Sequence, residues 1–265
     1  MKLFIQIKKG LKIQTDVIRG LYYRELITRI SRVRFGLFGI LIEPIGLIVI
    51  WLLFFGFRRG FRPVFSLDLI IFLVTGNIIF VLFNSISRRA IDAIKSNQAL
   101  FYYSRVKPFD TLIARTLVET NSYGIVYLVI VLSYYYFRNN LIVDNLPLIL
   151  ICYLLISIFS FGLGLILMTL GQRYIFSKEV VNVLFRPLYF LSGTLFALAS
   201  LPEELKAWLG WNPILHAIEL SRKGFSELYL LDPIVSLSYL VKSTIITLFI
   251  GILVYVKNER ILLKK

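Results

Sequence analysis

Residues 87–119 read SRRAIDAIKSNQALFYYSRVKPFDTLIARTLVE and form a polar interval between long apolar runs. Cations are spread along the interval together with a few acids: Arg88, Arg89, Lys95, Arg105, Lys107 and Arg115, with Asp92, Asp110 and Glu119. A loop rich in Lys and Arg between two membrane spans is usually cytoplasmic. The length and mixed charge of this interval indicate an ordered docking element rather than a bare turn.

The composition around this interval is that of a membrane protein. Of the 265 residues, 58% are hydrophobic and 15% aromatic, and the apolar runs are about 20 residues long, which is the length that crosses a bilayer as a helix. We therefore predict an all-α, polytopic membrane protein. The net charge of +15 is explained by Lys and Arg in cytoplasmic loops and at lipid headgroups, so we expect no nucleic-acid partner.

Six apolar runs are long enough to be membrane spans. They cover residues 37–57, 67–86, 117–137, 147–170, 181–199 and 234–256. With six spans both termini lie on the same side, and this side carries 21 Lys and Arg against eight on the other, with Arg186 inside a span left out. The excess predicts a multi-pass membrane protein with both termini in the cytoplasm.

Residues 1–34 form a separate basic segment before the spanning domain at residues 35–265. Apolar residues from Ile18 to Val33 recur at helical spacing, which predicts an amphipathic helix along the membrane surface. Glu25 and Arg29 interrupt this stripe as an i,i+4 pair. Two roles remain open for the helix: a basic anchor that fixes orientation, and a gate that moves.

A second region that is too polar to span lies at residues 201–232. Its acids and bases alternate with Trp208, Trp211 and several aliphatic residues, and Pro202 and Pro213 suit the first turn of a helix. We expect two short amphipathic helices that lie in, or dip into, the outer membrane face.

The sequence lacks the residues that several kinds of chemistry require. It has no GxxxxGK[ST] phosphate loop, so it is not itself an ATPase of that type. His216 is the only histidine and Cys152 the only cysteine, so we expect no metal site, no catalytic triad and no cofactor in this chain. A local polar or ionic cluster of His216, Glu219 and Arg222 is preferred to a metal site.

Three stretches resemble a known family. These are residues 34–44 (RFGLFGILIEP), residues 85–119, and residues 211–222 (WNPILHAIELSR). Together they are similar to the inner-membrane permease of capsular polysaccharide ABC exporters, the KpsM/BexB/CtrC group of the type-2 ABC transporter permease superfamily. The resemblance extends over nearly the whole chain, with one departure at Gly39, where the superfamily usually has Trp.

This resemblance implies a homodimer of permeases with two copies of a nucleotide-binding subunit, which would bind ATP and Mg. It also implies a lipid-linked polysaccharide substrate and capsule export proteins in the periplasm and outer membrane. Residues 1–34 would form a gate helix, residues 87–110 a coupling region, and residues 201–232 two outer re-entrant helices.

Candidate residues can be named for each of these parts, with a solvated basic loop as the alternative for the contact with the ATPase. The gate helix would use Tyr22, Glu25, Arg29 and Arg34; the contact with the ATPase would use Arg88, Arg89, Asp92, Lys95 and Asn97; and the re-entrant helices would carry Trp211, Asn212, Pro213, His216, Glu219 and Arg222.

Aromatic side chains are candidates for the conduit, since their faces stack on sugar rings without a deep binding minimum. The candidates are Phe54, Phe55, Phe80, Phe83, Tyr134, Tyr135, Tyr189 and Phe190, with lipid-facing or core positions as the alternative. The basic loop of Arg58, Arg59 and Arg62 meets either an anionic polymer or lipid phosphate.

Other functions remain open at the level of the sequence. They are an ion-coupled polyprenyl or lipid-glycan flippase, an ABC exporter of O-antigen or teichoic acid, and a membrane transferase. An ion-coupled carrier normally buries acids at mid-membrane, whereas the acids within the predicted spans, Glu43, Asp68 and Glu119, all lie near span ends. A transferase would need acids for a metal–nucleotide site, and the central cytoplasmic region has only Asp92 and Asp110 as aspartates, both among cations.

Overall fold

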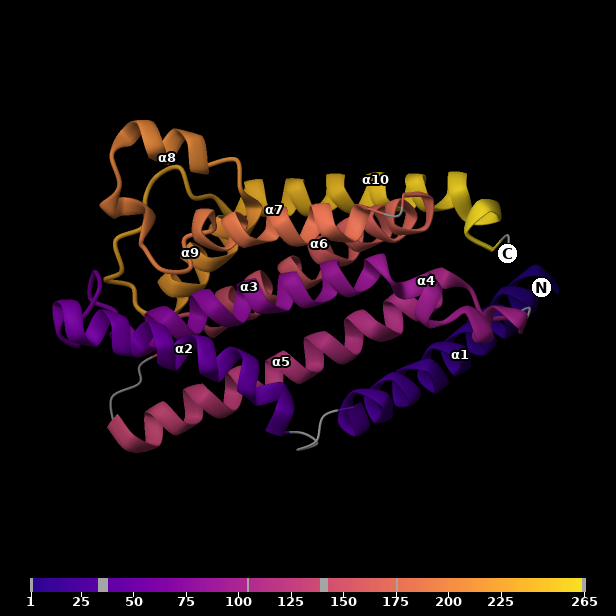
Figure 1. Cartoon of the computed structure of the whole chain (residues 1–265), viewed down its shortest axis with the longest axis horizontal. Helices are drawn as coiled ribbons and strands as arrows, with labels where there is room; N and C mark the ends of the chain where they lie inside the picture. Colours follow the sequence, from indigo (N-terminus) through magenta and orange to yellow (C-terminus); the bar gives the residue numbers. More distant parts are fainter. Residues whose placement is uncertain (1, 33–37, 104, 139–142, 175, 264–265) are drawn as a thin grey trace.

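The computed structural model describes residues 2–32, 38–103, 105–138, 143–174 and 176–263, and these residues form a helical bundle (Figure 1). Four helices in the described chain are long and apolar enough to span a membrane: α3 (Leu69–Ile91), α5 (Pro108–Arg138), α6 (Leu146–Arg173) and α10 (Leu237–Leu263). The all-helical membrane architecture predicted from the composition is thereby confirmed.

Helix α3 is the centre of the bundle. The side chain of Asp68 accepts a hydrogen bond from the Ile70 amide at 2.8 Å and so caps its first turn. The helix is mostly apolar from Leu69 to Phe83 and packs against α2, α5, α6, α7 and α9. A helix that is hydrophobic all round belongs in an interior, which explains why most of α3 is buried.

Helices α6 and α10 pack closely because of a glycine. A Cβ atom at Gly162 would lie only 2.8 Å from the backbone of Leu248 on α10, and such small residues let helices approach closely. The start of α6 is fixed by Asn145, whose side chain accepts from the Leu148 amide at 3.0 Å.

Two further helices contain an internal proline: α2 (Phe38–Arg59) with Pro44, and α7 (Ser177–Leu191) with Pro187. The predicted fifth span extended to residue 199, but α7 already ends at Leu191. Gly193 has a φ of +71°, a left-handed conformation that ends helices. The chain then turns through residues 192–197 into η2 (Leu198–Ser200).

The predicted third span also differs at its start. Helix α5 begins at Pro108 rather than near residue 117, so it includes part of the polar interval. Pro108 suits the first turn, and the Asp110 side chain accepts a hydrogen bond from the Lys107 amide at 3.1 Å. The apolar pattern alone does not reveal this extension, because the first turns of α5 carry charged residues.

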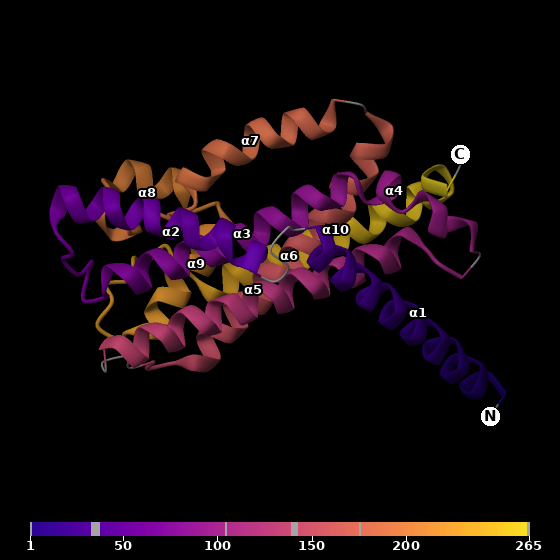
Figure 2. The ribbon, with the colours of Figure 1, turned by 60° about the horizontal axis from the view of Figure 1, so that its bottom comes forward.

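Both chain ends lie at one end of the bundle, together with α4 (Ala93–Ser96) and η1 (Gln98–Tyr102) (Figure 1). Helix α1 (Lys2–Arg32) packs against α5, and its N-terminal half diverges from the bundle (Figure 2). The opposite end holds α8 (Glu203–Leu209) and α9 (Pro213–Phe225). Helices are therefore present where the N-terminal helix, the coupling helix and the two short late helices were predicted.

Candidate functional site

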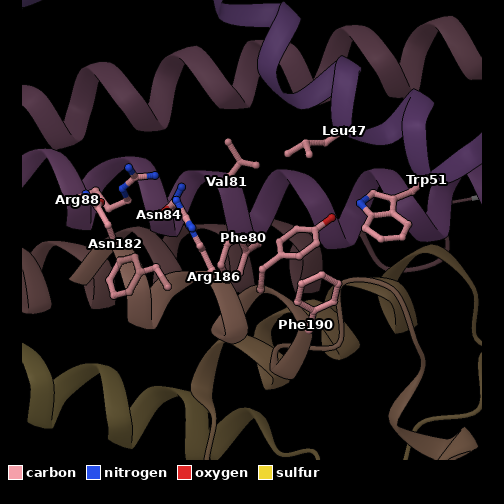
Figure 3. A pocket seen from close by; sticks show the side chains of 11 residues that line it. Leu47, Trp51, Phe80, Val81, Asn84, Arg88, Asn182, Arg186 and Phe190 are labelled. Carbon is pink, nitrogen blue, oxygen red and sulfur yellow. The ribbon is translucent and has the colours of Figure 1, made fainter. Parts of the chain in front are cut away.

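A cleft of about 520 Å³ lies between α2, α3 and α7 (Figure 3). We call it the aromatic cleft, and its lining consists of Leu47, Trp51, Phe80, Val81, Asn84, Arg88, Asn182, Phe185, Arg186, Tyr189 and Phe190. Its volume lies within the range of about 300–1,000 Å³ that is common for ligand sites.

Aromatic rings make up one end of the aromatic cleft. Tyr189 lies between Phe80 and Trp51, with ring centroids 5.0 Å and 6.5 Å away. Its hydroxyl donates a hydrogen bond of 2.6 Å to the side-chain oxygen of Asn77, and the Asn77 amide donates to the Leu73 carbonyl at 2.8 Å. This anchoring holds the Tyr189 ring in place in the lining of the aromatic cleft.

Cations and amides make up the other end of the cleft (Figure 3). Asn84 and Arg88 are one turn apart on α3, and Asn182 and Arg186 are one turn apart on α7, so each pair shares a helix face. Both arginines are exposed. A cleft that is aromatic at one end and cationic at the other suits a ligand with both ring faces and anionic or hydroxyl groups, and not a purely apolar molecule.

The eight predicted conduit aromatics have different surroundings. Phe80, Tyr189 and Phe190 line the aromatic cleft. Phe54 and Phe55 reach it through Trp51, at centroid distances of 5.7 Å and 6.2 Å. Trp51 itself was missed by the sequence analysis, although its position one turn before Phe54 and Phe55 was the available signal.

The remaining three aromatics lie outside the cleft lining. Phe83 is buried in the core against Phe159 and Phe185. Tyr134 is half-buried and Tyr135 is exposed near the carboxyl end of α5.

The end of the bundle with the termini holds a second cluster of functional candidates, which we call the latch. Its centre is Glu119 on α5, only 1% exposed, which pairs with Arg29 of α1 and with Arg89 of α3 at 2.9 Å. Ser85 also donates to this carboxylate at 2.9 Å. A single buried acid therefore joins three helices.

Arg115 makes a second set of contacts in the latch, one turn before Glu119. Its guanidinium donates to Glu25 of α1 at 3.0 Å, to the Arg89 carbonyl at 2.8 Å and to the Ser96 hydroxyl at 3.4 Å. The two charged residues expected to pair within the N-terminal helix thus pair across helices instead, Glu25 with Arg115 and Arg29 with Glu119.

The other predicted gate and coupling residues surround these pairs. Arg24 of α1 donates to Asn97, which is buried and donates in turn to the Ala93 carbonyl at 2.8 Å. Tyr22 accepts from Asn121 at 3.1 Å. Arg34 lies outside the residues that the structure describes.

The α3–α4 junction also contacts the helix that forms one wall of the cleft. Asp92 pairs with Lys178 at the start of α7 at 2.5 Å. Lys95 is exposed on α4, and Arg88, predicted to contact the ATPase, lines the aromatic cleft. The predicted coupling residues therefore divide between the latch, the cleft and the free surface of α4.

The outer segment contains a buried ionic core. Arg222 is fully buried and pairs with Glu219 at 3.0 Å. It also donates to the carbonyls of Phe196 and Thr194 at 3.0 Å each, and its guanidinium carbon lies 3.5 Å from the Phe72 ring centroid. Arg222 thereby fixes the segment after α7 to α3.

His216 makes backbone contacts apart from that pair. Its Nδ1 accepts from the Ser236 amide at 3.0 Å and its Nε2 lies 2.7 Å from the Gly210 carbonyl, so Nε2 carries the proton and the ring is neutral. Burial lowers the pKa of His216 from its usual 6.5.

Asn212 and its neighbours complete the outer segment. Asn212 caps α9 at the Ile214 amide, at 3.0 Å, immediately before Pro213. Trp211 is 61% exposed, and its carbonyl accepts from Tyr239 at 2.6 Å. Among the described residues no group of three His, Cys, Asp or Glu side chains is placed to hold a metal ion.

The family model and the relatives that match this chain are all transporter proteins, and each matches most of the chain. The family model described as ABC-2 type transporter matches residues 17–226. The chain is 36% identical over 256 residues to the polysialic acid transport protein KpsM of Escherichia coli, with 97% of this chain and 98% of the relative covered. It is 31% identical over 255 residues to the capsule polysaccharide export inner-membrane protein BexB of Haemophilus influenzae, with 95% and 94% covered. It is 29% identical over 217 residues to the capsule polysaccharide export inner-membrane protein CtrC of Neisseria meningitidis, with 82% of each chain covered.

Proposed function

The chain belongs to the ABC-2 type transporter family, and from this we propose that it is the permease subunit of a capsular polysaccharide exporter in the bacterial inner membrane. The observation that carries the proposal is the similarity to capsule export proteins over almost the entire chain. These comparisons favour a capsule exporter over the ion-coupled flippase that the sequence left open.

We propose that the aromatic cleft contacts the polysaccharide. Hydroxyl-rich sugar rings present apolar faces to Tyr189 and Trp51, while amides and guanidiniums at the other end bind polar or anionic groups. A lipid-linked substrate suits a cleft between helices that are themselves apolar. No covalent chemistry is required of this chain, because the permease moves its substrate without changing it.

Six spans per subunit follow if α2 and α7 cross the membrane together with the four long helices. Both termini lie toward the same end of the long axis as α4 (Figure 1), which supports a common side for them, and the Lys and Arg excess assigns that side to the cytoplasm. Helices α8 and α9 then lie at the periplasmic face, where they form the proposed re-entrant pair.

Energy enters through a separate nucleotide-binding subunit, which binds ATP and Mg. We propose two copies of it on a permease homodimer, with α4 and its exposed Lys95 as the contact. Movement of α4 reaches α1 through Arg115, which touches Ser96 and Glu25. It reaches α7 through Asp92 and Lys178. ATP drives transport by favouring one of two such arrangements.

The test is purification of the chain from its native membrane. We expect a nucleotide-binding subunit to co-purify in a 1:1 ratio, with export of polysaccharide into vesicles that depends on ATP and Mg and is insensitive to ionophores. Export driven by an ion gradient without a nucleotide-binding subunit would refute the proposal. Capsule export proteins of the periplasm and outer membrane are expected to continue the route.

A further inference from the structure

We propose that the chain has a second ligand site, at the end of the bundle opposite to the two termini, and that it binds the carboxylate or phosphate groups of an acidic glycan. The inference rests on the proposed function, because it assigns a class of polymer to the exporter. We call the site the loop cavity, since one wall is the connection between α2 and α3.

The loop cavity has a volume of about 960 Å³ and lies between residues 55–72 and residues 195–201. Its side chains include Arg58 and Arg62 together with Phe55, Phe65 and Phe72. This volume is at the upper end of the usual range for ligand sites, about 300–1,000 Å³. The cavity therefore has room for a segment of a polymer rather than for a single small ion.

The charge of the lining selects the ligand. Arg58 and Arg62 are both exposed, and the described residues that line the loop cavity include no acid to neutralise them. A guanidinium binds a carboxylate or a phosphate through two parallel hydrogen bonds. Aromatic faces beside these cations suit the ring of a sugar, so an acidic glycan matches both kinds of wall.

The backbone of the α2–α3 connection supports a functional role. Phe65 and Ser66 have φ values of 46° and 69°, a left-handed conformation that is costly for residues other than glycine. Two hydrogen bonds between Val64 and Leu67, of 2.8 Å and 3.0 Å, hold this turn closed. Such strain is concentrated at ligand sites, and here it places Phe65 in the lining.

The opposite wall is held in place by buried contacts. Arg222 binds the carbonyls of Thr194 and Phe196, and Phe196 lines the loop cavity. This wall is therefore a preformed surface, and a preformed surface lowers the ordering cost of binding a ligand.

A row of aromatic rings connects the loop cavity to the aromatic cleft. Tyr189 and Trp51 line the cleft with centroids 6.5 Å apart, and Trp51 lies 6.2 Å from Phe55, which lines the loop cavity. A polymer that leaves the cleft along α2 therefore meets Arg58 and Arg62 next. The loop cavity is the acidic-glycan site at the exit from this path.

The test measures binding by the full chain, purified with its native partners, in nanodiscs of neutral phosphatidylcholine. The probes are a fluorescent oligosialic acid, which carries carboxylates, and a neutral maltooligosaccharide of equal length. We expect oligosialic acid to bind in preference to the neutral probe. Each of Arg58→Gln and Arg62→Gln should weaken this binding about tenfold, the effect of one charge-assisted hydrogen bond.

Arg138→Gln is the matched control, because Arg138 is an exposed arginine at the carboxyl end of α5 and does not line the loop cavity. Equal weakening by Arg138→Gln, or equal binding of the neutral probe, would overturn the inference. A second set of nanodiscs with phosphatidylglycerol separates lipid from glycan. If Arg58→Gln and Arg62→Gln change only the retention of that lipid, the site binds headgroups and the inference is wrong.

The proposed function is measured separately, as ATP-dependent export by the wild-type complex. If the wild-type complex exports normally, but Arg58→Gln and Arg62→Gln bind oligosialic acid as tightly as the wild type, only the loop cavity is rejected. Absence of ATP-dependent export rejects the proposed function, whatever the probes bind.

Discussion

The guanidinium of Arg115 lies 3.0 Å from the carboxylate of Glu25, and so an arginine on α5 connects the N-terminal helix to α4. Both side chains are largely shielded, at 9% and 16% exposure. Removing one partner of such a pair leaves a poorly solvated charge behind. The pair is therefore placed to transmit movement as well as to hold α1.

Charge reversal tests this transmission. We expect Arg115→Glu or Glu25→Arg alone to reduce polysaccharide export about tenfold or more, because loss of a charge-assisted hydrogen bond is worth about 1.5–3 kcal/mol. The double variant, Glu25→Arg with Arg115→Glu, should recover a large part of the loss. The measurement is ATP-dependent export by membranes, together with ATP hydrolysis by the complex.

The ratio of these two activities separates coupling from folding. If the pair is purely structural, the single variants lower export, ATP hydrolysis and the amount of protein together. If the pair transmits movement, the variants still hydrolyse ATP but export little polysaccharide. Glu204→Arg, at an exposed acid on α8, is the control and should change neither activity. Failure of the double variant to recover any export would argue against a direct role of the pair.

Glu119 is expected to hold α1 against α5. This acid is buried between two cations, with Arg29 only 6% exposed, so Glu119→Gln leaves Arg29 without its counter-charge. Unpaired buried charges cost about 3–5 kcal/mol, and α1 should detach rather than bear this cost. We expect faster proteolytic cleavage of α1 than in the wild type. Cleavage at the wild-type rate would contradict the assignment.

The sequence was sufficient for the parts of the fold that follow from local pattern. Uninterrupted apolar runs predicted α3, α6 and α10, and Pro213 with its neighbours predicted the short helix α9. The end of α7 was predicted wrongly, because the apolar run continues past Leu191 and the turn at Gly193 is fixed by distant carbonyl contacts of Arg222.

The candidate site was less predictable because its contacts join helices that are distant in the sequence. Glu25 and Arg29 have suitable spacing for an i,i+4 pair, and only the packing of α1 on α5 brings better buried partners to them. The sequence showed that residues 87–119 are rich in cations. It could not show which of these cations lines the cleft, because that depends on how α3 is rotated about its axis. Arg88 and Arg89 are adjacent in sequence and have different neighbours.

Gly76 should tolerate no side chain. A Cβ atom there would lie 2.7 Å from the Thr194 carbonyl oxygen and 2.8 Å from the Arg222 guanidinium. We expect Gly76→Ala to destabilise the protein by about 1–3 kcal/mol, as overpacking does, and to lower the unfolding temperature measured in detergent. Gly46→Ala is the control: Gly46 lies in a helix with no atom within 4 Å of the added methyl group, so stability should stay equal or rise. Equal effects of both changes would exclude the close contact.

His216 predicts a dependence of stability on pH. Its pKa in the folded chain is lowered from the usual 6.5 by burial, so below this pH the unfolded chain binds a proton that the folded chain does not. Stability from His216 is therefore complete above pH 6.5 and decreases as the pH falls below it. Since this is the only histidine, His216→Gln should flatten the decrease in unfolding temperature between about pH 7.5 and pH 5.5. An unchanged slope in the variant would assign the decrease to other groups.

Trp51 is expected to contribute more to transport than any other tryptophan. It is the ring through which Tyr189 of the aromatic cleft connects to Phe55 of the loop cavity, so Trp51→Ala interrupts the row, whereas Trp51→Phe keeps a stacking face. Burial of one large side chain against a ligand is worth about 1.5–3 kcal/mol, which predicts an export rate about tenfold lower for Trp51→Ala and near normal for Trp51→Phe. Trp208→Ala, on α8 with 77% of the side chain exposed, is the matched control. If Trp51→Ala exports as well as Trp208→Ala at equal protein levels, the polysaccharide does not follow this row of rings.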